Sequence, residues 1–235
     1  MRIRGLSGLM LMLLGAAACT GAEIDGAATS ATSTPAAEEG ALEVLELPVP
    51  RLKGNLTLEE ALAARRSVRA FSDEPLTMQD LSQLLWAAQG LTASWGGRTA
   101  PSAGALYPLE VYLVTPKGLY HYLPEGHRAE LLSRTDLRVQ LSRAALGEAA
   151  VYGAPAVFVI TAVYARTTAK YGDRGERYVQ LEAGHVAQNL LLQAVALGLA
   201  GVPIGAFSDD DVGRLLDLPS DRVPLYLIPV GHSAE

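Results

Sequence analysis

Residues 156–163 (AVFVITAV) constrain the fold more than any other segment, because they form a near-continuous run of apolar side chains. A half-exposed strand alternates apolar and polar residues, so this unbroken run predicts a strand that is buried on both faces. The longest helical segment, residues 177–197, is apolar almost all round in its second half and ends at Gly198. Such a helix belongs in a core or in a subunit interface.

Shorter elements interleave with these two segments. Helices are predicted at 55–66, at 77–90 and after Ser208, because each begins with a capping residue three positions before an acidic residue. The capping pairs are Thr57 with Glu60, Thr77 with Asp80, and Ser208 with Asp211. Strands are predicted at 110–115, 119–123 and 225–230, the first two joined by a turn at 116–118. Strands and helices alternate without internal repeats, which predicts one domain of the α/β or α+β class.

The composition excludes several classes of protein. The chain has 235 residues, 49% of them hydrophobic and 19% charged, which is enough for one sizeable domain. Its net charge of -6 argues against nucleic-acid binding as the main role. Its single cysteine excludes an internal disulfide and a cysteine-rich zinc site, and no metal site is predicted.

The first 18 residues have the pattern of an export signal, because two arginines precede the apolar run LMLMLLGAAA. Cys19 follows three alanines and resembles the acylated cysteine of bacterial lipoproteins, although Ala16 stands where that motif prefers Leu. Ordinary cleavage after the alanines, with Cys19 incidental, is the alternative. Residues 19–41 are small and polar, which predicts a flexible tether before a folded domain at 42–235. We therefore expect an exported, lipid-anchored protein on the periplasmic side of a bacterial cell envelope.

Common catalytic motifs are missing from the sequence. It contains no G-x-S-x-G, P-loop or G-x-G-x-x-G motif, and its four histidines lack metal-binding spacing. A serine hydrolase, a P-loop NTPase, a Rossmann dehydrogenase and a zinc enzyme are therefore disfavoured. A basic cluster does follow the first predicted helix, formed by Arg65, Arg66, Ser67 and Arg69. Its guanidinium groups can bind one phosphate, or they can stay solvated at the helix end.

Four segments in this order resemble the nitroreductase superfamily of FMN-dependent enzymes: ARRSVRAFSDEPLTMQDLSQLLWAAQGLT, PSAGALYPLEVYLV, YVQLEAGHVAQNLLLQAVALGLAGVPIGAF and LIPVGH. The similarity spans residues 42–232 and is closest to the branch of peptide azoline (thiazoline/oxazoline) dehydrogenases. It implies an α+β sandwich with a central, mostly antiparallel sheet flanked by helices. It also implies a homodimer with a long interface helix and FMN bound at the interface.

The resemblance also implies roles for particular residues. Arg65, Ser67 and Arg69 would hold the FMN phosphate, with Arg66 as a helper and His232, beside Gly231, as a weaker fourth ligand. The loop of Ser102, Ala103 and Gly104 would line the flavin ring or ribityl chain, although Ala105 stands where many nitroreductases have Asn. The segment of Pro203, Ile204, Gly205 and Ala206 would bring a backbone N–H to flavin N5, with Gly205 in place of a frequent Glu. A plain turn is the alternative for this last segment.

Lys170 and Tyr171 form a candidate acid/base pair, because they match a neighbouring Lys and Tyr of the azoline dehydrogenase branch. In that branch the pair removes a ring proton while hydride leaves to FMN. A lysine in a partly dry pocket can act as the base, since desolvation brings its pKa toward neutrality. A solvated lysine in a charged loop is the alternative. His185 and Asn189 are expected to make core or interface hydrogen bonds.

The sequence thus predicts an FMN-dependent oxidoreductase that passes hydride through flavin N5. A flavin-binding or electron-carrier module with little turnover of its own is the alternative. The substrate is expected to be a peptide, as for the azoline dehydrogenases, or a small molecule such as a nitro compound or a quinone. Export would separate the protein from the cytoplasmic NAD(P)H pool, and any membrane contact would come through the lipid anchor.

Overall fold

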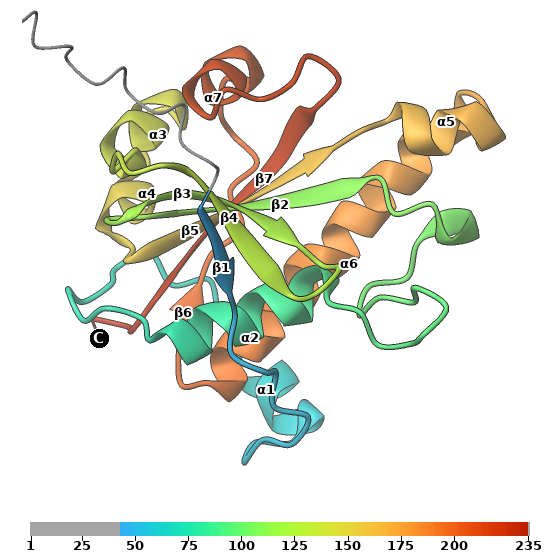
Figure 1. The fold of residues 1–235 in the computed structure, drawn as a ribbon. Helices are drawn as coiled ribbons and strands as arrows, with labels where there is room; N and C mark the ends of the chain where they lie inside the picture. Colours follow the sequence, from blue (N-terminus) through green and yellow to red (C-terminus); the bar gives the residue numbers. More distant parts are fainter. Residues whose placement is uncertain (1–42, 235) are drawn as a thin grey trace, which may run out of the picture. The chain divides into compact units, whose positions relative to one another are not determined.

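A computed structural model describes residues 43–234, so the predicted signal peptide, Cys19 and the tether lie outside the described residues. The described chain is built around a seven-stranded sheet (Figure 1). Its strands are β1 (Glu43–Glu46), β2 (Leu109–Thr115), β3 (Gly118–Leu123), β4 (Arg128–Ser133), β5 (Ala156–Ala162), β6 (Ala200–Gly201) and β7 (Val223–Gly231). Their order is β1-β4-β3-β2-β5-β7-β6, with antiparallel neighbours throughout. The expected α+β fold with an antiparallel sheet is confirmed.

Helices cover both faces of this sheet (Figure 1). They are α1 (Leu58–Ala64), α2 (Met78–Gln89), α3 (Arg138–Ala144), α4 (Ala149–Gly153), α5 (Ala165–Tyr171), α6 (Arg174–Ala196) and α7 (Asp209–Leu215), with a 3-10 turn η1 (Ala103–Ala105). Helices α2 and α6 pack on one face, and α3, α4 and α7 pack on the other. Helix α1 packs against α6, and α5 lies against the start of α6.

The strand predicted from the unbroken apolar run is β5, the middle of these layers. All seven of its residues have no exposed surface. Phe158 and Ile160 pack with α2 and α6, whereas Val157 and Val159 pack with the helices of the opposite face. Burying a side chain of this size contributes about 1.5–3 kcal/mol, so β5 stabilises both layers at once. The prediction of a strand buried on both faces is confirmed.

The predicted capping residues of three helices are also confirmed. Thr57 and Thr77 cap α1 and α2 in complete capping boxes, and the Ser208 hydroxyl accepts a hydrogen bond from the Asp211 N–H at 3.3 Å. Helix α1 is shorter than the predicted 55–66 at both ends, because it begins only after its N-cap Thr57 and the chain turns into an extended conformation at Arg65. The long helix begins at Arg174, three residues earlier than predicted.

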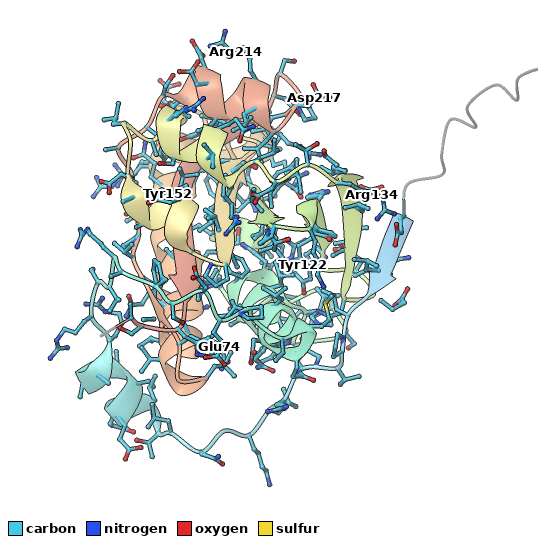
Figure 2. The ribbon with its side chains drawn as sticks, turned by 90° about the vertical axis from the view of Figure 1, so that its left-hand side faces the viewer. Glu74, Tyr122, Arg134, Tyr152, Arg214 and Asp217 are labelled. Atoms are coloured by element: carbon cyan, nitrogen blue, oxygen red, sulfur yellow. The ribbon has the colours of Figure 1, made fainter. Side chains whose placement is uncertain are left out.

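Several elements carried no clear sequence signal: β1, β4, β6, α3, α4 and α5. Strand β1 is an edge strand, and an ion pair joins its Glu43 to Arg134, which lies at that edge in Figure 2. Tyr122, also labelled in Figure 2, is instead buried, with its hydroxyl 2.8 Å from Nδ1 of His127. Among residues 43–234 no helix is long and apolar enough to cross a membrane.

Candidate functional site

The residues after α1 run alongside β6 and the end of β7. Ser67 and Gly201 form a parallel bridge, and the Val68 N–H donates to the Gly201 carbonyl at 3.2 Å. Farther on, the Ser72 N–H donates to the carbonyl of His232 at 3.0 Å. These backbone contacts bring the predicted phosphate cluster and the predicted residues 231 and 232 to one end of the molecule. We call this set of residues, 65–69 with 231–232, the arginine group.

The three arginines of the arginine group differ in what they bind. Within the described residues, the side chains of Arg65 and Arg69 form no ion pair or hydrogen bond. Arg66 donates from Nη1 to the carbonyls of Ala63 and Arg65 at 2.9 and 2.8 Å. Arg66 therefore completes the end of α1, the role foreseen as the alternative for this cluster. Arg65 and Arg69 keep their guanidinium groups available for an anion.

Gly231 and His232 also belong to the arginine group, but each has a structural partner. A Cβ atom on Gly231 would lie 2.6 Å from Cδ of Pro155, so the glycine permits close packing there. The His232 Nε2 atom lies 3.7 Å from Oε1 of Glu74, which is labelled in Figure 2. His232 thus pairs with a carboxylate and is less suited than Arg65 or Arg69 to hold a phosphate.

Residues 203–206 follow β6 after one residue, Val202, and lie at the same end. Ile204 is buried and exchanges two backbone hydrogen bonds with Leu227, at 2.8 and 3.0 Å. The next two residues, Gly205 and Ala206, are exposed. A Cβ on Gly205 would make ordinary contact with Tyr226 at 3.6 Å, so tight packing inside this chain does not require the glycine. An exposed glycine backbone can approach a flat ring without a side chain in the way.

The predicted loop 102–104 meets the predicted acid/base pair. Gly104 has φ +64°, and a Cβ built on it would lie 2.8 Å from the Tyr171 hydroxyl and 2.9 Å from Nζ of Lys170. Lys170 and Tyr171 end α5 and are not in a loop, because Gly172 with φ +57° stops that helix. Figure 1 shows α5 and the turn before β2 at the same end of α6. We call these residues, 102–104 with 170–171, the lysine–tyrosine group.

The loop holds an unusual backbone shape. Ala105 and Tyr107 both have positive φ, 54° and 44°, which costs non-glycine residues about 1–2 kcal/mol each. The Ser102 hydroxyl accepts a hydrogen bond from the Tyr107 N–H at 2.9 Å and so closes the loop. Strained backbone of this kind concentrates at functional sites, where surrounding contacts hold it.

A charged network that the sequence did not reveal fastens α5 to the sheet. Arg166 contacts Oε1 of Glu110 at 2.5 Å and donates to the Tyr107 carbonyl at 3.1 Å. Oε2 of Glu110 lies 2.8 Å from Nε2 of His121. Burial raises the pKa of the Glu110 carboxyl, but the bonds with His121 and Arg166 outweigh it and lower that pKa to about 2. The sequence did contain a signal for this network, because Glu110 and His121 are polar residues within two otherwise apolar strands.

The two groups lie apart in one chain. Loop 102–104 lies beside Glu182 in the first half of α6, whereas the arginine group lies beyond its last residue, Ala196. At 1.5 Å per residue, roughly 21 Å of helix separates Glu182 from Ala196. Helix α6 also carries Asn189, which donates to the Thr99 carbonyl at 3.2 Å, and His185, which is exposed. An apolar pocket of about 250 Å³ between β1 and α2 contains none of the predicted site residues.

Comparison with known proteins decides the family. The model of the Nitroreductase family matches residues 62–232, most of the described domain. The chain belongs to the nitroreductase family. It is 42% identical over 199 residues to a protein of Methanocaldococcus jannaschii named as a nitroreductase, covering 82% of this chain and 99% of that one. A solved structure from Ralstonia eutropha, also named as a nitroreductase, matches with TM-score 0.74 and 34% identity over 82% of this chain and 90% of that one.

Two further relatives of this nitroreductase-family protein carry more specific names. It is 28% identical to the microcin B17-processing protein McbC of Escherichia coli, over 56% of this chain and 52% of McbC. It is 27% identical to an NADPH-flavin oxidoreductase of Vibrio harveyi, over 74% of this chain and 64% of that protein. The protein is therefore an oxidoreductase of the nitroreductase family, in which flavin is the usual cofactor.

The side chains of this nitroreductase-family protein fit a flavin. Arg65 and Arg69 have free guanidinium groups for a phosphate, and loop 102–104 consists of small residues. At Gly104 a Cβ atom would intrude between the loop and the side chains of α5. In the part of the chain that the structure describes, no group of three or more His, Cys, Asp or Glu residues could hold a metal ion.

Proposed function

We propose that this protein is an FMN-dependent oxidoreductase in which Lys170 and Tyr171 handle the proton that accompanies hydride transfer. The observation that carries the proposal is the convergence of Lys170 Nζ and the Tyr171 hydroxyl on Gly104. Support for the flavin comes from a solved structure from Vibrio harveyi named as an NADPH:FMN oxidoreductase, which matches with TM-score 0.58 and 25% identity over 76% of this chain and 69% of that one.

The proposed working unit is a homodimer. The arginine group and the lysine–tyrosine group lie near different ends of α6, so two antiparallel copies of α6 would bring the groups of opposite subunits together. Exposed leucines on α1 and α6 support this arrangement: Leu58, Leu62 and Leu181 are 61%, 51% and 52% exposed. Helices α1 and α6 pack together, so a dimer formed through them would cover these exposed apolar side chains.

Each group would then have a separate task. Arg65 and Arg69 of one subunit bind the phosphate through charge-assisted hydrogen bonds, and the Ser67 hydroxyl adds a neutral one. The backbone of residues 203–206 would hold the flavin ring, with Gly205 leaving room for it. Bound FMN supplies the hydride acceptor and donor, its N5 atom.

Lys170 and Tyr171 supply the acid/base chemistry. Lys170 is exposed in the single chain, and its Nζ atom lies 5.4 Å from the centre of the Tyr171 ring. A second subunit placed over this surface would remove water from the amine, which suits a base that takes a proton from a bound substrate. The Tyr171 hydroxyl, which converges on Gly104 with the amine, can then hold the proton that the substrate loses.

A peptide azoline is the substrate that the lysine–tyrosine pair favours, because oxidation of that ring requires loss of a proton together with hydride. McbC, a relative named as a microcin B17-processing protein, supports this choice. The NADPH-flavin oxidoreductase relative supports small acceptors in its place. Turnover of both classes therefore has to be measured.

The test uses the purified full chain loaded with FMN. We expect a flavin absorbance spectrum and turnover of azoline peptides, nitro compounds or quinones. Lys170→Ala should lower kcat about 100-fold or more without weakening FMN binding, whereas Lys53→Ala, at an exposed position, should change neither. A protein that does not bind FMN would contradict the cofactor, and unchanged turnover in Lys170→Ala would remove Lys170 from the reaction.

We also propose that the protein is exported and lipidated at Cys19. The arginines and apolar run before three alanines and the single cysteine support this proposal. Mass spectrometry of the N-terminal peptide from the native host should show a diacylated or triacylated cysteine. An intact Met1 would contradict both export and lipidation.

A further inference from the structure

The apolar pocket between β1 and α2 has no part in the proposed reaction. Its volume is about 250 Å³, and its walls come from β1, residues 75–85, the β2–β3 hairpin, β4 and Pro155. Protein interiors leave few voids larger than a water molecule. An apolar cavity of about 150 Å³ is large enough to bind benzene, so this pocket has room for a ligand of roughly ten carbon atoms.

The walls of this pocket are aliphatic. Its most buried lining residues are Leu85, Leu113 and Ala129, which are 0%, 3% and 3% exposed. Leucines of β1 and α2 complete the wall. Among the lining residues, all of which belong to the described chain, Tyr120 alone is aromatic. A flat ring would therefore find few stacking partners, whereas an aliphatic chain can contact every wall.

The polar side chains of the lining are gathered at one end of the pocket. Thr115, Lys117 and Tyr120 lie at or beside the turn that joins β2 to β3. Oγ1 of Thr115 accepts a hydrogen bond from the Lys117 N–H at 3.1 Å and so fixes this turn. The rest of the lining, within residues 43–234, consists of Leu, Pro, Met and Ala side chains. The pocket thus has an apolar body and one polar end.

Lys117 gives the polar end its charge. It is the one charged residue that lines the pocket in the described chain, and its exposed side chain forms no ion pair or hydrogen bond there. Pro75, Met78 and Pro116 are also exposed, so the pocket opens to solvent at this rim. An ammonium at the mouth of an aliphatic pocket is complementary to a ligand with an apolar chain and an anionic head.

We propose that this pocket binds an aliphatic carboxylate of about ten carbons, with its chain between β1 and α2 and its carboxylate beside Lys117. A second copy of the chain fits less well, because an interface between proteins covers about 800 Å² on each partner and this pocket holds one chain. The binding is separate from the proposed oxidoreductase reaction, since no lining residue belongs to the arginine group or the lysine–tyrosine group.

Calorimetric titration of the full chain with decanoate, below its micelle-forming concentration, tests the proposal. The protein is free of flavin, because Pro155 also packs closely against Gly231 of the arginine group. Decanoate should bind with one-to-one stoichiometry, and octanoate about tenfold more weakly, since it buries two fewer methylenes. Lys117→Gln should weaken decanoate binding about fivefold, the effect of losing an exposed ion pair, and leave decanol binding unchanged. Lys53→Gln, at an exposed position outside the pocket, should change neither.

Met78 reports where the ligand binds. It lines the pocket and is the one methionine within residues 43–234, the others being Met1, Met10 and Met12. With ¹³C-methyl methionine, the NMR resonance that is missing from Met78→Leu identifies its methyl group. That resonance should shift on addition of decanoate and saturate with the affinity that calorimetry gives.

Filling the pocket should prevent binding. Leu76→Trp adds bulk to a half-buried lining residue and should abolish binding of both decanoate and decanol. Leu132→Trp on β4, which is exposed and outside the pocket, should bind decanoate as the wild type does. Thermal unfolding of the unliganded variants checks that they fold; if Leu76→Trp does not, Lys117→Gln and the Met78 resonance decide.

Three results would overturn the proposal. They are a Met78 resonance that does not respond to decanoate, decanoate binding that is unchanged in Lys117→Gln, and a Met78 resonance that shifts with protein concentration alone. The last result would show that a second copy occupies the pocket. None of these measurements involves FMN, so they decide the role of the pocket even if the proposed function fails.

Discussion

Arg166 of α5 and Glu110 of β2 form an ion pair, with Nη2 and Oε1 2.5 Å apart. The same guanidinium donates to the carbonyl of Tyr107, at the end of the strained loop, so one side chain joins α5 to both the sheet and the loop. Lys170 lies one helical turn beyond Arg166, on the same side of α5. The placement of the candidate acid/base pair over Gly104 therefore depends on a charge pair at the start of β2.

Glu110→Gln should make the protein less stable at neutral pH and less sensitive to acid. The pKa of Glu110 is lowered from 4.5 to about 2, so its stabilisation is complete above pH 4.5 and is lost as the pH falls toward 2. A shift of this size corresponds to roughly 3 kcal/mol. Urea unfolding at about pH 6 and about pH 2.5 measures it. Glu46→Gln, an exposed residue of β1, is the control; equal acid sensitivity in Glu110→Gln and the wild type would contradict the prediction.

Glu182→Gln should have the opposite pH dependence. The pKa of Glu182 is raised from 4.5 to about 7, so folding is unaffected by this group below pH 4.5 and is progressively disfavoured as the pH rises to 7. Above pH 7 the amide variant should be more stable than the wild type by roughly 3 kcal/mol, and near pH 4.5 the two should be alike. Denaturant titrations at both pH values compare them. A constant difference between the two proteins would mean that Glu182 does not titrate in this range.

Gly104→Ala should impair catalysis far more than folding. The new Cβ would crowd the Lys170 amine and the Tyr171 hydroxyl, which can move away only by leaving the loop. Gly147→Ala is a matched control, because Gly147 also has positive φ, +80°, but has no atom within 4 Å of the added Cβ. Both variants should lose about 1 kcal/mol of stability from backbone strain. Only Gly104→Ala should lower kcat, by about tenfold or more; equal kcat in both variants would show that the close contact has no catalytic role.

Arg65→Ala and Arg69→Ala should weaken FMN binding about tenfold or more each, through loss of a charge-assisted hydrogen bond to phosphate. Arg66→Ala should affect the melting temperature more than FMN affinity, since Arg66 bonds the end of α1. Riboflavin lacks the phosphate, so its binding should be insensitive to all three substitutions. Fluorescence titrations with the two flavins measure these effects. An equal loss of riboflavin and FMN binding would place the arginines elsewhere than at the phosphate.

Leu181→Asp should convert the proposed dimer to monomers. Leu181 is 52% exposed on α6, and a carboxylate there would be buried without a partner when two copies associate. Val139→Asp on α3 is the control, because Val139 is 50% exposed on the opposite face of the sheet. Sedimentation velocity should show a monomer for Leu181→Asp and a dimer for the control and the wild type. A dimer in all three proteins would mean that this part of α6 is not the interface.

Much of the fold was predictable because its signals are local. The capping boxes of Thr57 and Thr77 involve residues three positions apart, and the hairpin of β2 and β3 closes across a short turn. Strands β1 and β4 were missed because they are short and partly exposed, so their sequences lack a strong apolar pattern. Helix α5 was missed for the same reason, although its last two residues were singled out by resemblance.

By itself, the sequence determined that β5 is buried on both faces, where the helices begin, and to which family the chain belongs. These properties follow from apolar runs, capping pairs and motifs within short segments, which do not depend on contacts between distant parts of the chain. The tertiary structure decided which of the arginines is used by the end of α1, that Lys170 and Tyr171 face Gly104, and that Glu182 is buried beneath Ser102. These contacts join residues from distant parts of the chain, and only the packing of α5, α6 and the loop before β2 sets their geometry.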